Sequence, residues 1–188
     1  PFFLYLGHKD VHVPLYPSER FRGRSAAGPY GDAVEELDWS VGRVFQTLTD
    51  LKLADRTLVI FSSDNGPWLI MKENGGSALP LREGKGTTYE GGMREPGIAW
   101  WPGRVAAGVV TGEMACTMDL FTTSLKLAGA PVPQDRVIDG VDQRAFFEGK
   151  QEQSNRLKLL LTPIPGGREA SVLWRWKPNW KVRRPFPC

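Results

Sequence analysis

The chain has 188 residues, a length that suits a single domain with its own hydrophobic core. Hydrophobic residues make up 41% and charged residues 24%, as in ordinary globular proteins, and the net charge of +3 is too small to indicate nucleic-acid binding. No apolar run reaches the roughly 18 residues of a membrane-spanning helix, and no signal peptide is recognisable. The sequence therefore predicts a globular protein with no transmembrane segment and no nucleic-acid partner.

The first part of the sequence predicts a strand, a helix and a second strand. Residues 2–6 are apolar and aromatic, which favours a buried strand. A long helix is predicted over residues 30–53, because apolar residues recur there at spacings of three and four. Residues 57–61 are apolar without polar alternation, which is typical of a central parallel strand. Together these elements predict a βαβ unit with a right-handed crossover.

The rest of the sequence is less regular. Residues 66–94 form a long glycine-rich connection, and such connections inside a domain are usually functional or disordered. A third strand is predicted over residues 97–101, and a second helix over residues 117–128 with Gly129 as its stop. The core candidates of this helix are Met118, Phe121, Leu125 and Leu127. No clear period continues beyond about residue 150.

Polar side chains follow both predicted parallel strands at their carboxyl ends. His8, Lys9, Asp10 and His12 come after the first strand, and Asp64 and Asn65 come after the second. In open α/β sheets, ligands bind beyond the carboxyl ends of the strands. The two polar clusters are therefore expected on the same edge of one sheet.

Each candidate residue has a functional and a structural interpretation. The oxygens of Asp64 and Asn65 suit Ca²⁺ or Mg²⁺, although Asp-Asn-Gly more often forms a turn. His12 could give a proton to a leaving group or simply lie exposed in a loop. Lys85, between two glycines, could point its ammonium at an anionic substrate or be a mobile surface lysine. Their order along the chain is more informative than any one of them.

Several segments in chain order resemble the formylglycine-dependent sulfatases. They read PFFLYLGHKDVHVP, YGDAVEELDWSVG, TLVIFSSDNGP, GKGTTYEGGMREP and MDLFTTSLKLAG, followed by IDG. The resemblance covers residues 1–150 and implies an α/β, alkaline-phosphatase-like fold with a mostly parallel central sheet flanked by helices. It also implies hydrolysis of sulfate esters with a formylglycine nucleophile and a bound Ca²⁺. By motif, Asp64 and Asn65 match metal ligands, Lys85 matches a sulfate-binding lysine, and His12 matches the histidine near the leaving-group oxygen.

The same resemblance implies partners and a location. The substrate is expected to be a sulfated glycan or glycolipid, and the full-length parent is a possible homodimer. A lysosomal or secreted location is expected, although the chain shows no signal peptide.

The sequence also departs from the family. The nucleophile motif Cys-x-Pro/Ala-Ser-Arg is absent, because Cys116 is followed by Thr117 and Met118. The family's first pair of metal aspartates and its Lys-x-His segment are absent too. We therefore expect residues 1–150 to be a C-terminal portion of the catalytic domain and residues 151–188 to be a divergent basic, Trp-rich tail. We expect the chain alone to be inactive, with its formylglycine cysteine upstream.

Two alternatives stay open. A phosphoric ester hydrolase shares the fold, but it would need two zinc-type sites, and the chain has only His8 and His12. A non-catalytic truncated isoform would explain the missing motifs without any chemistry.

Overall fold

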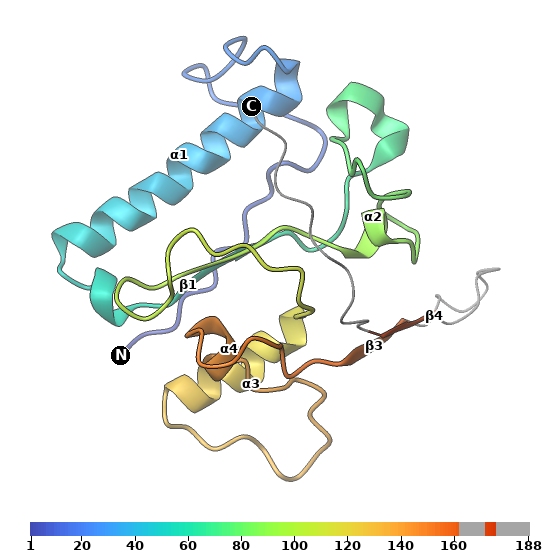
Figure 1. Ribbon diagram of the computed structural model, residues 1–188. Coiled ribbons are helices and arrows are strands. Elements are labelled where there is room, and N and C mark those ends of the chain that lie inside the picture. Colours follow the sequence, from blue (N-terminus) through green and yellow to red (C-terminus); the bar gives the residue numbers. More distant parts are fainter. Residues whose placement is uncertain (162–171, 176–188) are drawn as a thin grey trace. The chain divides into compact units, whose positions relative to one another are not determined.

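The computed structural model describes residues 1–161 and 172–175 of the chain. It forms two compact units, one made of residues 2–101 and the other of Pro1 with the residues from Pro102 onward. Helices and strands are labelled as in Figure 1. Among the described residues, no helix combines the length and the apolar character needed to cross a lipid bilayer.

A long amphipathic helix, α1 (Gly28–Asp50), is the main element of the first unit and confirms the first predicted helix (Figure 1). It ends where Lys52 takes a left-handed conformation with φ 56°. The N–H of Leu53 then donates to the Leu48 carbonyl at 2.8 Å, which satisfies a carbonyl that the helix leaves unpaired. A short 3-10 helix, η1 (Ala54–Arg56), leads from α1 to the strands.

Two strands confirm the second and third predicted strands: β1 (Val59–Ser62) overlaps the one predicted over residues 57–61, and β2 (Gly97–Trp100) lies within the one predicted over residues 97–101. They pair in an antiparallel arrangement, with Val59 opposite Trp100. The ring of Phe45 on α1 lies 4.7 Å from the ring of Trp100, centroid to centroid. The helix is therefore packed against the two-stranded ribbon through an aromatic pair.

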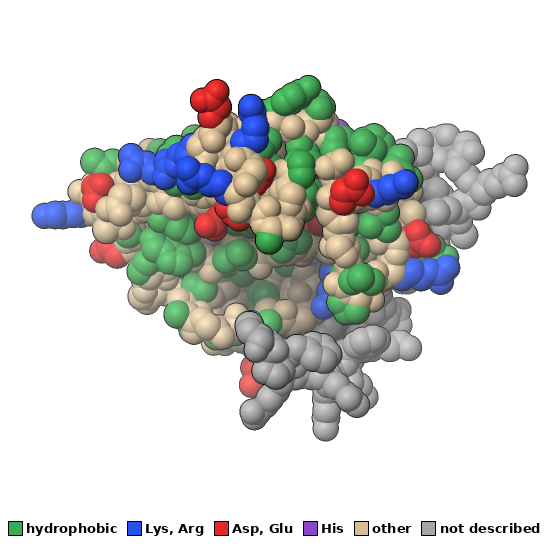
Figure 2. Space-filling view, turned by 90° about the horizontal axis from the view of Figure 1, so that it is seen from above, with side chains coloured by type: hydrophobic (Ala, Val, Ile, Leu, Met, Phe, Trp, Pro, Cys, Tyr) green, Lys and Arg blue, Asp and Glu red, His purple; other side chains and the backbone are tan. Residues whose placement is uncertain are grey.

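The predicted parallel sheet is not confirmed, and the predicted buried strand over residues 2–6 is wrong in this structure. That segment is not a strand, and its side chains are exposed, with Phe3 at 80% and Tyr5 at 84%. Figure 2 shows further hydrophobic side chains lying among charged ones on one face. A strand requires a hydrogen-bonded neighbour, and β2 is the one strand that pairs with β1 in the described part of the chain. An apolar run predicts burial but does not identify this partner.

The glycine-rich connection packs backbone against backbone. It contains a 3-10 helix, η2 (Leu69–Asn74), and a single-turn helix, α2 (Glu90–Met93). The N–H of Gly66 donates to the Gly92 carbonyl at 3.1 Å, and a Cβ on Gly66 would overlap the carbonyl oxygen of Gly91. Glycine is needed here because any side chain would prevent these segments from approaching each other.

The second unit contains α3 (Thr117–Leu127), α4 (Arg144–Phe147), β3 (Lys158–Leu161) and β4 (Val172–Arg175). The predicted helix is confirmed by α3, which is followed by Gly129 in a left-handed conformation with φ 70°. β3 and β4 form an antiparallel pair that the sequence did not predict. The predicted boundary near residue 150 stays a prediction, and most of the tail lies outside the described residues.

The core face predicted for α3 is wrong at Met118 and Phe121, while Leu125 and Leu127 are half-buried. Met118 and Phe121 are 42% and 49% exposed, whereas Asp119 is fully buried. The carboxylate of Asp119 accepts hydrogen bonds from the Nε and Nη2 atoms of Arg156, which is only 8% exposed. This partner, 37 positions along the chain, makes burial of the carboxylate tolerable, so α3 turns a polar face inward.

Candidate functional site

His12 and Lys85 meet in the first unit, although they lie in separate loops. The Nδ1 atom of His12 is 2.6 Å from the Val13 carbonyl oxygen, and a carbonyl can only accept, so Nδ1 carries the proton. The Nε2 atom of the neutral ring then accepts a hydrogen bond from Lys85 Nζ at 3.2 Å. The result is an ammonium group and an imidazole nitrogen side by side, with His12 exposed and Lys85 half-buried.

The backbone around Lys85 explains its position. The Lys85 N–H donates to the Pro67 carbonyl at 2.9 Å, which ties the lysine to the segment that follows β1. Gly84 is buried, and a Cβ there would overlap the Pro67 carbonyl oxygen. The glycine before Lys85 therefore serves close contact within the chain, whereas the sequence suggested close approach to a ligand.

Asp64 and Asn65 lie directly after β1 in the same unit. Asp64 is exposed and Asn65 is half-buried. The Nδ2 atom of Asn65 donates to the Gly66 carbonyl at 3.0 Å, and the Ser63 hydroxyl donates to the Asn65 carbonyl at 3.0 Å. Local bonds thus hold this turn, as the structural interpretation predicted, and they leave the Asp64 carboxylate facing solvent.

Glu95 is a nearby residue that the sequence did not single out. Its Oε1 atom is buried and has no hydrogen-bond partner among the described residues. Burial raises the pKa of Glu95, and the negative charge of Asp64 raises it further. An unpaired buried carboxylate oxygen beside a second carboxylate is an environment that a hard cation would stabilise. In the sequence, Glu95 is visible only as an acidic residue just before β2, which does not reveal this environment.

Asp64, Asn65 and Glu95 offer the kind of ligand atoms that Ca²⁺ binds, although they do not enclose an ion. Carboxylate and amide oxygens from Asp64, Asn65 and Glu95 are the donors that Ca²⁺ prefers. No group of three or more His, Cys, Asp or Glu side chains within residues 1–161 and 172–175 is placed to hold a metal ion. The structure thus joins His12 to Lys85 and connects Lys85 to the segment after Asn65, and convergence of all four predicted residues on one ligand stays a prediction.

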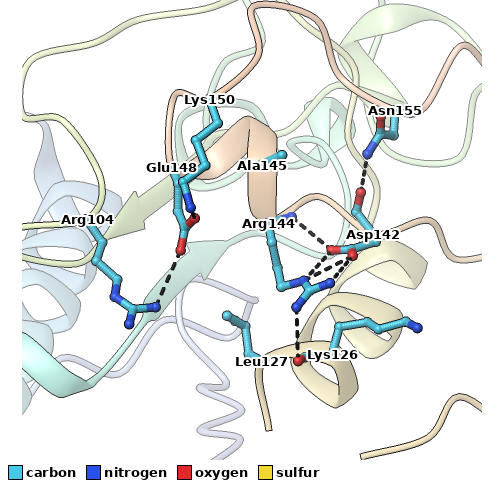
Figure 3. Close-up of a pocket in the computed structure, with 9 residues that line it drawn as sticks. All are labelled: Arg104, Lys126, Leu127, Asp142, Arg144, Ala145, Glu148, Lys150 and Asn155. Atoms are coloured by element: carbon cyan, nitrogen blue, oxygen red, sulfur yellow. Dashed lines mark hydrogen bonds and ion pairs between the residues drawn. The ribbon is translucent and has the colours of Figure 1, made fainter. Parts of the chain in front are cut away.

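The second unit has a hollow of its own, which contains none of the predicted residues (Figure 3). Its volume is about 380 Å³, and most of its lining is charged. Arg144 pairs with Asp142 at 2.7 Å, while Glu148 pairs with both Arg104 and Lys150. The lining holds four cations and two carboxylates, so the hollow is an ion-pair cluster that keeps a net positive charge.

Comparison with protein families gives one assignment. The model of the sulfatase family matches residues 1–130. Among curated proteins, the human N-acetylgalactosamine-6-sulfatase is 54% identical over 187 residues, covering 96% of this chain and 36% of the relative. Human arylsulfatase A is 49% identical over 163 residues, covering 87% of this chain and 32% of the relative. The chain therefore spans about a third of the length of these relatives.

A solved structure gives the same assignment at the level of the fold. A structure from a study of glycosaminoglycan metabolism by Bacteroides thetaiotaomicron superposes with a TM-score of 0.80 at 33% identity. The match covers 94% of this chain and 38% of that one. The predicted resemblance is confirmed by the family model, the curated relatives and this superposition, and the chain belongs to the sulfatase family.

Proposed function

We propose that the 188-residue chain forms part of a sulfuric ester hydrolase that cleaves sulfate esters of glycans or glycolipids. The observation that carries the proposal is the contact between Lys85 Nζ and His12 Nε2 at 3.2 Å. A sulfate ester carries negative charge that must be neutralised, and its leaving oxygen needs a proton. A cation and an imidazole nitrogen held together meet both needs at one place.

Lys85 and His12 take different roles in this proposal. The Lys85 ammonium binds the sulfate oxygens and stabilises the charge that they carry in the transition state. His12 acts through Nε2, because Nδ1 is occupied by the Val13 carbonyl. In the described tautomer Nε2 is an acceptor, so this exposed ring must first take up a proton from solvent when Lys85 turns to the sulfate. The imidazolium then gives this proton to the oxygen of the leaving group and returns to the neutral ring.

Asp64 and Asn65 would hold a Ca²⁺ ion in the complete site. When bound, the ion polarises the sulfate group and helps to neutralise it. The unpaired oxygen of Glu95 supports this assignment, since it places a further negative charge near Asp64. The chain's own residues then supply oxygen donors for the ion, while Lys85 and His12 act on the sulfate and its leaving group.

The 188 residues contain no motif from which the family's formylglycine could be made. Binding substrate and transition state equally well does not accelerate a reaction, so we propose that this chain alone binds sulfate without turning over a sulfate ester. A lysosomal or secreted location and a homodimeric parent are proposed from the family resemblance. The phosphoric ester hydrolase and the non-catalytic isoform are the competing assignments.

The test combines binding and turnover. Titration calorimetry of the chain with inorganic sulfate should show weak binding that Lys85→Ala removes and that Lys126→Ala, an exposed lysine on α3, leaves unchanged. Tighter binding of phosphate than of sulfate would favour the phosphoric ester hydrolase. A longer protein that joins these residues to the cysteine motif should hydrolyse p-nitrocatechol sulfate, and the chain alone should not. Hydrolysis by the chain alone would show that a nucleophile is present after all, and no sulfate binding would favour the non-catalytic isoform.

A further inference from the structure

Trp68 lies beside both members of the proposed sulfate-binding pair. Its ring centroid is 5.9 Å from that of His12, with the two planes at 38°. The Lys85 Nζ atom lies 5.4 Å from the Trp68 ring centroid, within the range of a cation–π interaction. The indole is half-buried, so part of it remains open to a ligand.

The indole is held in this place by the backbone. The backbone N–H of Trp68 donates a hydrogen bond to the Gly75 carbonyl at 3.1 Å, and the backbone carbonyl of Trp68 accepts one from the Met71 N–H at 2.9 Å. Gly75 cannot carry a Cβ without overlapping the Trp68 carbonyl oxygen. The backbone of Trp68 is therefore fixed at both its N–H and its carbonyl, and from this position its ring lies next to Lys85.

We propose that the indole of Trp68 binds the pyranose ring that carries the sulfate ester. This inference rests on the proposed function, because it requires the sulfate group at Lys85. The sulfate and the sugar ring are joined through the ester oxygen and, in a 6-sulfate, one methylene carbon, so a sulfate on Lys85 brings the sugar within reach of an indole 5.4 Å from that ammonium. The C–H face of a pyranose is apolar and matches the indole surface.

The polar edge of the indole favours a sugar over an aryl or steroid ring. Trp68 Nε1 has no hydrogen-bond acceptor among the described residues, and this N–H can only donate. A sugar offers ring hydroxyls as acceptors at the same time as it offers an apolar face. A plain hydrocarbon ring would leave that N–H without a partner from the ligand.

The alternative is that Trp68 only positions Lys85 through the cation–π contact. The two interpretations differ in which ligand depends on the indole. If Trp68 only positions the ammonium, its loss weakens all sulfate compounds equally. If it binds the sugar, its loss weakens the binding of sulfated sugars more than the binding of a ringless sulfate ester.

The experiment measures affinity of the 188-residue chain for three probes: methyl sulfate, galactose 6-sulfate and cyclohexylmethyl sulfate. We expect galactose 6-sulfate to bind about threefold to tenfold more tightly than methyl sulfate, as a single aromatic contact allows. Trp68→Ala should abolish this preference, because it should lower the affinity for galactose 6-sulfate by a larger factor than the affinity for methyl sulfate. Trp68→Phe should keep the apolar face and lose the preference for galactose 6-sulfate over cyclohexylmethyl sulfate. Trp39→Ala, at another half-exposed tryptophan of the same unit, is the matched control.

The outcomes separate this inference from the proposed function. An equal loss for methyl sulfate and galactose 6-sulfate in Trp68→Ala would overturn it in favour of a positioning role. Equal affinity of the native chain for both ligands would overturn it as well. If Lys85→Ala leaves methyl sulfate binding intact, the proposed function itself fails. Trp68→Phe keeps the test decisive if Trp68→Ala does not fold.

Discussion

The Nζ atom of Lys85 lies 3.2 Å from the Nε2 atom of His12, although the two residues are 73 positions apart in the sequence. The tautomer of His12 is fixed by the Val13 carbonyl, so the lone pair of Nε2 faces the ammonium. A ligand with anionic oxygens can replace this contact by offering acceptors to Lys85. The pair is therefore ready to bind an anion without rearrangement of the chain around it.

Removal of either member should abolish most activity of a longer protein that contains the complete site. We expect Lys85→Ala and His12→Ala each to lower kcat/KM for p-nitrocatechol sulfate by about 10²-fold or more, since each removes a group that acts in the transition state. Lys85→Arg keeps the positive charge and should retain more activity than Lys85→Ala. Full activity of either alanine variant would remove that residue from the proposed mechanism.

Loss of the Glu95 charge should have opposite effects with and without Ca²⁺. In the metal-free chain, Glu95→Gln should raise the urea midpoint at neutral pH, because it removes a carboxylate that is partly buried near Asp64. In a longer protein that contains the proposed Ca²⁺ site, it should weaken Ca²⁺ binding measured by calorimetry, since a negative charge near the ion is lost. Glu90→Gln, in an exposed pair with Arg94 at 3.7 Å, should change neither quantity appreciably. Unchanged Ca²⁺ affinity in Glu95→Gln would separate Glu95 from the metal site.

Two glycine substitutions should change stability in opposite directions. Gly66→Ala should destabilise the first unit, because the new Cβ would overlap the Gly91 carbonyl oxygen and break the contact that orders the glycine-rich connection. Gly42→Ala should stabilise it by about 0.5–1 kcal/mol, since Gly42 lies within α1 with open space around its Cα. Urea denaturation followed by circular dichroism checks both. A stable Gly66→Ala variant would mean that the connection is less tightly packed than the structure shows.

Local patterns in the sequence predicted the elements that depend on local interactions. The apolar spacing of α1 and the stop at Gly129 after α3 need only neighbouring residues, and both are confirmed. The residues of β1 and β2 were also identified, but their antiparallel pairing joins residues 35 to 41 positions apart and leaves no local signal. Residues 2–6 have the composition of a strand, yet composition alone does not supply a hydrogen-bonded neighbour.

The residues of the candidate site also divide into those that the sequence identifies and those that only the structure identifies. Its oxygen donors and its lysine were recognised by motif, because the order of such residues is visible in a sequence. Glu95 and Trp68 were missed, since their importance lies in an unpaired atom and in a distance to Lys85. The buried polar face of α3 was missed for a similar reason, because Asp119 is acceptable in a core only where Arg156 reaches it.

The Asp119–Arg156 pair should make the second unit sensitive to acid. Burial alone would raise the pKa of Asp119, but hydrogen bonds from Arg156 and from the N–H groups of Val141 and Cys116 hold it below its usual value. A carboxyl group with a lowered pKa in the folded state stabilises the fold above its unfolded pKa of about 3.9. This stabilisation is lost as the pH falls from the unfolded pKa through the lowered pKa of Asp119 in the folded state.

Asp119→Asn should therefore destabilise the second unit by about 3–5 kcal/mol at pH 7, because it leaves the Arg156 guanidinium buried without its counter-charge. The variant should also lose less stability than the native chain when the pH is lowered from 5 to 2, since the titrating carboxyl is gone. Urea denaturation at several pH values measures both effects. Asp135→Asn is the matched control: its carboxylate pairs with Arg136 at 2.6 Å, but the pair is exposed, so little change is expected. A native-like acid response in Asp119→Asn would mean that other carboxyl groups dominate the acid sensitivity of this unit.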